Sequence, residues 1–397
     1  MLFYGDDKDN SCCRYCGISR YKDAKEGGSN TILRNVLRYF PLTTRLKRLY
    51  MFARTAEHMK WYKNRVVTEG VHTHPADGEE WKEFDKNYPD FSQDIRNVRL
   101  GLTTYGFPPY SNGTSGIYSV WPVLIQLWQC GVETYDASTK TNFILRAALL
   151  WTISDYPGLA MVSGFHSVQE VCVNRFSGTW KLHSKERDDG YGVTHNWTQV
   201  TSFFDLPYGD TLRLRYCIDV MHIEKNVFEN VFHTVIGSFK LKDTTTARKD
   251  LEALNIIPEL WLNGSRKHKA KYTFNRDQLK LLCNWVVQLK FSDGCSSNIA
   301  RYCKVSQLKF HEMKSHDCHV FMQKFLPSTL RELLPNDIHK ALCDLSNFFK
   351  GLCAKELLLS DLVKMQKNVV GIVCTLETIF FPGFFDPMEH LLVHLVE

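Results

Sequence analysis

The order of apolar and polar residues predicts a basic helix followed by strands in the first half of the chain. From Leu42 to Val67, apolar residues recur at helical spacing, and Lys and Arg residues surround them. The run from Asn97 to Leu102 alternates like a strand and stops before a proline-rich turn. The continuous apolar run from Phe143 to Asp155 is typical of a buried strand. Asp155 ends that run, so we expect it at a sheet edge where sites are built, although a turn-forming aspartate is an equal alternative.

The second half of the chain predicts helices. Residues 219–235 and 274–289 have helical spacing, and residues 326–396 are rich in Leu, Phe, Cys and Lys with few helix breakers. The polar, glycine-broken stretch 184–197 predicts a loop between subdomains. We therefore expect three parts, which are an N-terminal cysteine knuckle and linker (1–40), an α/β core (41–240) and a mainly helical C-terminal region (241–397).

Composition narrows the class of protein. The chain has 397 residues, of which 44% are hydrophobic, so it can bury a large core. Its net charge of +6 suits a polyanionic partner without requiring one. The 13 cysteines are odd in number and scattered, which favours reduced thiols in the cytosol or nucleus. The acidic N-terminus has no apolar signal region, and no stretch approaches the roughly 18–20 apolar residues of a membrane span, so we expect neither secretion nor membrane insertion.

Two features of the first 60 residues indicate ligands. Cys13 and Cys16 form a C-x-x-C followed by Gly17, the spacing that lets two thiolates bind one structural Zn²⁺. A tetrahedral site needs four ligands and no second pair lies nearby, so zinc is one of two interpretations. The basic helix supplies candidate phosphate contacts, with a solvated charged face as the alternative. The candidates are Arg45, Lys47, Arg48 and Arg54.

Other acids and histidines form weaker patterns. Asp219 and His222 lie three residues apart, so on a helix the carboxylate can orient the ring or both can face a metal; a helix N-cap with an incidental histidine is the alternative. Two further groups could bind zinc, residues 316–319 (His-Asp-Cys-His) and the pair His390 and His394. The pair lacks the glutamate of a helical H-E-x-x-H hydrolase. The chain also lacks a phosphate-binding G-x-x-x-x-G-K-[ST] loop, a dinucleotide fingerprint and a G-x-S-x-G elbow, so nucleotide-driven enzymes and common hydrolases fit poorly.

Several strings together resemble the transposase of plant CACTA (En/Spm-like) transposons. They include CRYCGISRYK at 13–22, NVRLGLTTYGFPPY at 97–110, RAALLWTISDYPG at 146–158, IDVMHIEKNV at 218–227, KSHDCHVFMQ at 314–323 and FPGFFDPMEHLLVHL at 381–395. The resemblance spans nearly the whole chain. It implies a ribonuclease-H-like core whose mixed sheet presents an Asp-Asp-Glu triad to two Mg²⁺ or Mn²⁺ ions, which cleave a phosphodiester in line.

The resemblance also assigns individual residues. Tyr105 stands where the family has its first catalytic aspartate, and a phenol cannot replace a bridging carboxylate. Asp155 matches the second catalytic aspartate and would be the metal ligand. The third acid, a glutamate, would lie past Glu397. Asp219 and His222 match the family's D-x-x-H signature, which is expected to support the active site.

Two departures from the family indicate an internally deleted and C-terminally truncated copy with an incomplete core. Several dozen residues are missing between Val123 and Leu124, and the family's C-x-x-C after Gly164 is reduced to Cys172. The leading hypothesis is a nuclear protein that binds transposon-end DNA without cleaving it, alone, as a self-associated assembly or with an intact transposase. One alternative is an active transposase in which Asp94 or Asp136 replaces the lost acid. The other is a protein-interaction module formed by the C-terminal helices.

Overall fold

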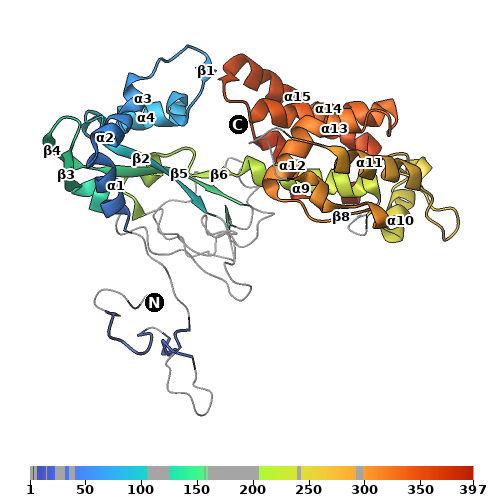
Figure 1. Ribbon diagram of the computed structural model, residues 1–397, viewed down its shortest axis with the longest axis horizontal. Helices are drawn as coiled ribbons and strands as arrows, with labels where there is room; N and C mark the ends of the chain where they lie inside the picture. The colour runs from blue at the N-terminus through green and yellow to red at the C-terminus, as the bar shows by residue number, and fades with distance from the viewer. Residues whose placement is uncertain are drawn as a thin grey trace.

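Helices and small sheets mix in this chain, as expected. The computed structural model in Figure 1 describes residues 3, 7–14, 16–22, 32–34, 41–104, 126–155, 158–159, 205–238, 243–291 and 298–396. Figure 1 shows a lobe with a small sheet and a lobe of helices, and the N-terminal segment lies apart from both. The ribonuclease-H-like core and the cysteine knuckle stay predictions.

A three-stranded parallel sheet forms the centre of the first lobe. Its order is β2–β5–β6, so the long strand β5 pairs on both sides. The bounds are β2 Val98–Thr104, β5 Ala147–Ser154 and β6 Tyr216–Ile218. An antiparallel hairpin, β3 (Val132–Asp136) and β4 (Thr141–Leu145), precedes β5. The predicted strand at 97–102 is therefore confirmed as β2.

The predicted strand at 143–155 is two strands. Strand β4 ends at Leu145, and β5 begins at Ala147 after Arg146 alone. Arg146 donates its backbone N–H to Asn97 Oδ1 at 2.9 Å and its Nε–H to the carbonyl of Trp128 at 2.8 Å. These two hydrogen bonds fix the point where the chain leaves the hairpin and enters the central strand. Most of β5 is buried, as the apolar run indicates.

The prediction of one continuous helix at 42–67 is wrong. The structure has three short helices there, α1 (Leu42–Tyr50), α2 (Ala53–His58) and α3 (Trp61–Asn64). The carbonyl of Tyr50 accepts a hydrogen bond from the backbone N–H of Ala137 in the β3–β4 turn, and Phe52 is extended. The hairpin therefore takes a carbonyl that a continuing helix would use. The amphipathic pattern itself is confirmed, since Leu46, Tyr50 and Ala56 are buried. Helices α4 (Glu79–Asn87) and α5 (Pro89–Ser92) also belong to the described part of this lobe.

The helical lobe forms a second hydrophobic core. Both predicted helices are present, as α9 (Val220–Ile236) and α11 (Arg276–Gln288), and the C-terminal region is helical as expected. The remaining helices of this lobe are α10 (Thr245–Ala253), α12 (Ser315–Val320), α13 (Leu326–Thr329), α14 (Asn336–Leu352), α15 (Leu359–Ile379) and α16 (Pro387–Leu391). Helix α9 continues from β6 and buries its apolar face among the later helices. The domain bounds at 40 and 240 stay predictions.

A short strand pair joins the two lobes. Strand β1 (Val71–His72) pairs antiparallel with β9 (Leu357–Leu358), which directly precedes α15. The backbone N–H of Leu359 extends this pair by donating to the carbonyl of Gly70. No helix in the described parts of the chain has the length and apolar character needed to cross a bilayer.

A tyrosine supports the central strand at an irregularity in its pairing. Leu100 pairs with Leu149, but Gly101 pairs with Trp151, so the register shifts by one residue of β5. The backbone N–H of Leu149 donates to the hydroxyl of Tyr208 at 2.7 Å, and Tyr208 is fully buried. This hydrogen bond satisfies a buried donor that would otherwise cost free energy.

We expect Tyr208→Phe to lower the free energy of unfolding by about 1–3 kcal/mol, because it leaves the buried N–H of Leu149 without its acceptor. Urea denaturation of the full chain measures this change. Tyr135→Phe is the matched control, since Tyr135 is 48% exposed on β3 and its loss of a hydroxyl should change little. Equal stabilities of the two variants would contradict the assigned role of Tyr208.

Candidate functional site at the carboxyl ends of the parallel strands

Two of the predicted site residues meet at one edge of the sheet. Ser154 and Ile218 are paired residues at the ends of β5 and β6, and Asp155 and Asp219 are the next residues of the two strands. The backbone N–H of Asp219 donates to the carbonyl of Ser154 at 3.1 Å. Sites in α/β proteins gather outside the carboxyl ends of parallel strands. The parallel register therefore creates a candidate site from residues 64 positions apart in the sequence.

Backbone N–H groups hold both carboxylates. Asp219 caps helix α9, because its Oδ1 accepts from the N–H of Met221 at 2.8 Å. Asp155 Oδ1 accepts from the N–H of Gly158 at 2.8 Å, and a Cβ added at Gly158 would lie 2.6 Å from this oxygen. Asp219 is thus a helix N-cap, and Asp155 forms a turn with Gly158, as the alternative interpretations of these two acids predicted. They are compatible with a site, because they fix where each carboxylate lies.

His222 shares the start of α9 with this pair. It is half-buried in the first turn of the helix, three residues after Asp219. Residues at this spacing lie on one face of a helix, so the ring projects on the side of α9 that carries the cap. The structure therefore brings the three predicted catalytic positions, Asp155, Asp219 and His222, to one region.

The two carboxylates are of the chemical type that binds a divalent ion, although within the described residues Asp155, Asp219 and His222 do not form a three-donor metal group. Mg²⁺ is commonly bound by one or two carboxylates, with water and substrate phosphates completing its octahedron, and Mn²⁺ accepts similar oxygen ligands. Asp155 and Asp219 would supply those carboxylates, and a bound ion would neutralise charge on a phosphate group. The two-ion centre that the resemblance implies needs a further acid at the same edge. Tyr105 lies outside the described residues.

The two acids considered as replacements lie elsewhere. Asp94 precedes β2, so it lies near the amino end of the sheet, about 20 Å from the carboxyl edge along a seven-residue strand. It forms an ion pair with Arg96 at 2.7 Å. Asp136 lies at the turn of the β3–β4 hairpin, fully buried. Burial alone would raise its pKa, but hydrogen bonds from Ser138 and Thr139 and the charge of Lys60 hold the pKa at about 2. The structure therefore brings neither acid to the site.

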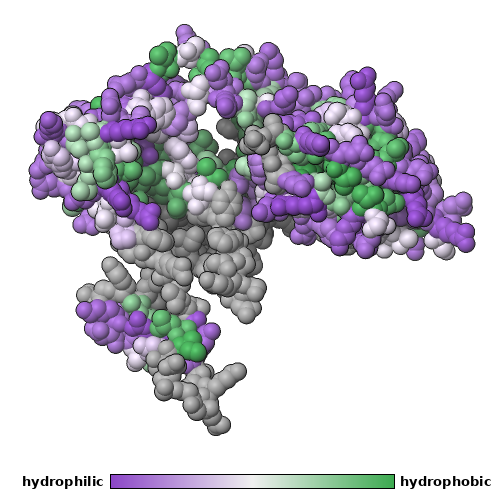
Figure 2. All heavy atoms as spheres, in the orientation of Figure 1, coloured by the Kyte–Doolittle hydropathy of each residue, from purple (hydrophilic) through white to green (hydrophobic). Residues whose placement is uncertain are grey.

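The predicted DNA-contacting residues lie on the first two helices. Arg45 and Arg48 on α1 and Arg54 on α2 are exposed, whereas Lys47 is half-buried. On the lobe that contains these helices, Figure 2 shows hydrophilic side chains interspersed with apolar ones. Met51 and Phe52, between α1 and α2, are about 60% exposed (62% and 59%). This surface thus combines positive charge with apolar side chains.

Two other basic residues of the predicted helix have internal partners. Lys60 forms an ion pair with Asp136 at 3.3 Å, and Arg65 forms one with Asp77 at 2.6 Å. Hydrogen bonds hold the carboxylate of Asp77, and they lower its pKa although burial opposes this. These two cations therefore stabilise the lobe rather than extend the basic surface.

The cysteine pair forms a tight turn. The N–H of Gly17, which has a φ of 68°, donates to the carbonyl of Cys13 at 2.8 Å. Cys13 is buried and Cys16 is exposed. Within the described ranges, neither joins a group of three or more His, Cys, Asp or Glu side chains suited to a metal ion. Zinc at this pair stays a prediction.

The histidine groups divide in the structure. In α12, Asp317 is buried and accepts a hydrogen bond from the hydroxyl of Tyr302 at 2.7 Å, and Cys318 is also buried. His316 is exposed, while His319 contacts Glu224 of α9. Residues 316–319 therefore do not form one metal site. The rings of His390 and His394 do lie together, with their Nε2 atoms 3.4 Å apart.

Sequence reasoning missed two residues of a second cluster. Glu224, His319 and Cys353 come from α9, α12 and the end of α14, and their donor atoms lie within 4.8 Å of one another. A signal existed for Glu224, because this acid interrupts the apolar face of a predicted helix between Ile223 and Val227. No local pattern marks Cys353, whose place depends on tertiary packing.

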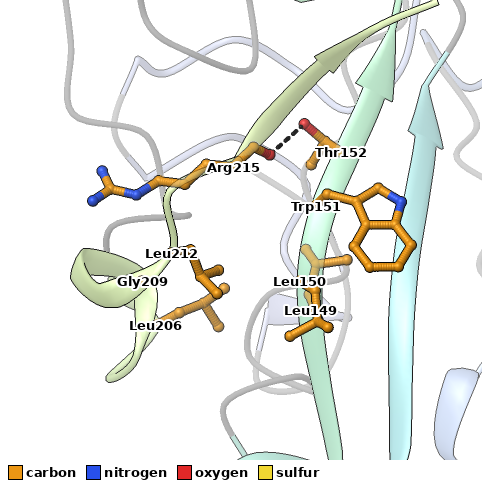
Figure 3. A pocket seen from close by; sticks show the side chains of 8 residues that line it. All are labelled: Leu149, Leu150, Trp151, Thr152, Leu206, Gly209, Leu212 and Arg215. Atoms are coloured by element: carbon orange, nitrogen blue, oxygen red, sulfur yellow. Dashed lines mark hydrogen bonds between the residues drawn. The ribbon is translucent and has the colours of Figure 1, made fainter. Parts of the chain in front are cut away.

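A hollow beside β5 lacks the side chains of a reactive site. Figure 3 shows leucine side chains of β5 facing leucines of the segment before β6, and the guanidinium of Arg215 points away from them. The hydroxyl of Thr152 donates to the carbonyl of Arg215 at 3.2 Å. The lining residues are Leu149, Leu150, Trp151, Thr152, Leu206, Gly209, Leu212 and Arg215. The hollow is therefore packing space next to the sheet.

Comparison with known families gives two matches. A family model described as "Transposase family tnp2" matches residues 69–126 and 123–191. Part of this chain is similar to a transposase. A second model, described as a domain of unknown function (DUF4218), matches residues 352–397. The two matches together are typical of plant transposase-derived proteins. No curated protein and no solved structure matches the chain.

The transposase match covers part of the candidate site. It includes β2, β5 and Asp155, whereas Asp219 and His222 lie beyond its end at residue 191. The second match includes Cys353 and the pair His390 and His394. The two matches thus lie in different lobes, and β1 of the first match pairs with β9 of the second.

Substitutions at Asp219 separate its capping role from its carboxylate. We expect Asp219→Ala to lower the free energy of unfolding by about 0.5–2 kcal/mol, because α9 loses its side-chain cap. Asp219→Ser keeps a capping oxygen and should unfold nearly like the wild type. Both variants lose the carboxylate, so both should bind Mn²⁺ more weakly than the wild type in a calorimetric titration. Unchanged Mn²⁺ affinity in the folded Ser variant would exclude Asp219 as a ligand.

Proposed function

We propose that this chain is a transposase-derived protein of the CACTA type that binds transposon-end DNA in the nucleus and does not cleave it. The observation that carries this proposal is the transposase family match over β5 and over Asp155, which directly follows it. The meeting of Asp155 and Asp219 at one sheet edge supports the same origin, because phosphoryl-transfer sites of this kind need acids that converge on one edge. The CACTA assignment rests on the resemblance of strings such as RAALLWTISDYPG at 146–158 and IDVMHIEKNV at 218–227.

An internal deletion is part of the proposal. The transposase match is divided into two pieces that overlap at residues 123–126. The resemblance to CACTA transposases implies that the missing residues lie between Val123 and Leu124. A family model that aligns in two pieces around this point is what such a deletion would produce.

Loss of cleavage follows from the number of acids. Two-metal catalysis needs one ion to activate the attacking oxygen and another to stabilise the leaving oxygen. Asp155 and Asp219 suffice for one ion, Tyr105 replaces the first aspartate of the family, and Asp94 and Asp136 lie at other parts of the lobe. The remaining site can bind an ion and a phosphate without completing the reaction.

Binding to DNA is assigned to the surface of α1 and α2. Exposed arginines can neutralise backbone phosphates, and the release of counterions drives such binding. Arg45, Arg48 and Arg54 are exposed for this purpose, and Lys47 is partly so. A second copy of the chain or an intact transposase is a further proposed partner. Both would bind the same transposon ends as this chain.

We expect purified full-length protein to show no Mg²⁺- or Mn²⁺-dependent nicking of transposon-end DNA, because the described part of the chain brings only two acids, Asp155 and Asp219, to this edge of the sheet. A strand-cleavage assay on labelled duplex measures this. Metal-dependent nicking that disappears in Asp155→Ala would contradict the proposal and support an active transposase. Nicking that persists in Asp155→Ala would indicate a contaminating nuclease.

We expect affinity for duplex DNA to fall steeply with salt, and Arg48→Gln/Arg54→Gln to reduce the slope of log affinity against log salt concentration by about 2. Each lost phosphate contact removes about 0.9 from that slope. Fluorescence anisotropy at several salt concentrations measures it. Lys364→Gln on α15 is the control, since Lys364 is also exposed but lies in the other lobe. Binding that is absent, or flat with salt, would favour the protein-interaction alternative.

A further inference from the structure

Helix α9 carries a second acid, deeper in the molecule than its cap. Glu224 lies five residues after Asp219, about 7.5 Å along the helix axis. Its side chain is fully buried, and burial raises its pKa although His319 and Gln323 oppose this. A buried carboxylate is costly unless charged or hydrogen-bonded partners surround it. Its surroundings therefore indicate what it does.

Those partners come from other helices. His319 Nδ1 lies 2.6 Å from Glu224 Oε2, and Gln323 Nε2 donates to Glu224 Oε1 at 3.0 Å. The third side chain is Cys353, at the end of α14, with a free thiol. The carboxylate oxygen, ring nitrogen and sulfur all lie within 4.8 Å of one another. Three elements far apart in sequence thus bring three different metal-ligand types to one point.

We propose that Glu224, His319 and Cys353 bind a Zn²⁺ ion. Zinc accepts carboxylate, imidazole and thiolate ligands at about 2.0–2.3 Å, so the donors of a tetrahedral centre lie about 3.3–3.7 Å apart. The present separations reach this geometry with side-chain movements on the order of 1 Å. Three protein ligands leave one position for water, as in other three-ligand zinc sites.

The surrounding groups favour a cation at this point. Partial burial raises the pKa of the Cys353 thiol, and the carboxylates of Glu224 and Asp219 raise it further, whereas a hydrogen bond with Gln323 opposes them. Negative charges that disfavour a bare thiolate attract a divalent ion, and the ion then deprotonates the thiol. Cys353 lies at the surface, which gives an ion a route to the buried acid.

Gln323 would orient the ligands. Its Nε2 donates to Glu224 Oε1 and lies 3.3 Å from the carbonyl of Phe349, so it ties the carboxylate to α14. Hydrogen bonds of this kind fix ligand geometry in metal sites. The ion would join α9, α12 and α14, and through α9 it would steady the helix start at Asp219. This site is separate from the cysteine pair near the N-terminus and does not depend on the proposed function.

Zinc binding to the full chain tests the proposal. The measurements use a Cys13→Ser/Cys16→Ser background, so that the N-terminal pair contributes nothing. Zn²⁺ is titrated against a chromophoric chelator, and Co²⁺ is added separately to record the near-ultraviolet band of a thiolate–cobalt bond. We expect Cys353→Ser to abolish this band and to weaken zinc binding roughly tenfold or more, because even partners outside the ligand set contribute 10–100-fold.

Two controls make the test specific. Cys374→Ser removes another exposed thiol, on α15, and should leave binding unchanged. His319→Ala should weaken binding, whereas His316→Ala, which removes an exposed histidine of the same helix, should not. Circular dichroism confirms that each variant is folded; Cys353→Ser changes a surface residue and carries the test if His319→Ala fails to fold.

Two results would overturn the proposal. One is that the protein with intact Cys353 binds no Zn²⁺ and shows no thiolate–cobalt band with Co²⁺. Glu224 and His319 would then form an ion pair only. The other is zinc affinity that stays the same in folded Cys353→Ser, which would place any bound ion elsewhere, for example at His390 and His394.

Discussion

The parallel pairing of β5 with β6 is the constraint on which the candidate site depends. It places the ends of the two strands side by side, and the hydrogen bond from Asp219 N–H to the carbonyl of Ser154 extends the pairing by one residue. Without that register, Asp155 and Asp219 would have no reason to meet. Strand β2 pairs on the other side of β5 with one register shift, and beside this shift the hydroxyl of Tyr208 accepts a hydrogen bond from the N–H of Leu149.

Helix α9 transmits this arrangement to the second lobe. It begins at the Asp219 cap, ends at Gly237 in a left-handed conformation, and buries its apolar face in the helical core. Asp219 at the sheet edge and Glu224 of the second cluster therefore lie on the same helix. The short β1–β9 pair adds a second connection between the lobes. A change in the helical lobe that rotated α9 would move Asp219 relative to Asp155.

Much of this arrangement follows from local sequence patterns. The apolar run before Asp155 predicted a buried strand with an acid at its end, and Asp219 had the position of a helix cap. The buried strand before Asp155 is confirmed as β5, although the run divides at Arg146, and the cap at Asp219 is confirmed because capping depends on neighbours in sequence. The break of the first helix was missed, because a carbonyl of Tyr50 bonds to Ala137 in a distant hairpin. Cys353 was missed for a similar reason, since only the tertiary packing of the helical lobe brings the end of α14 to Glu224. The ribonuclease-H-like assignment rests on resemblance and stays a prediction.

The most direct measurement of the central claim is a crystal structure of the full chain grown with Mn²⁺, in which anomalous scattering locates the ion. The account predicts one anomalous peak within coordination distance of both the Asp155 and Asp219 carboxylates, at the carboxyl ends of β5 and β6. Carboxylates that lie in separate parts of the molecule, or a folded sheet edge with no ion between them at saturating Mn²⁺, would contradict it.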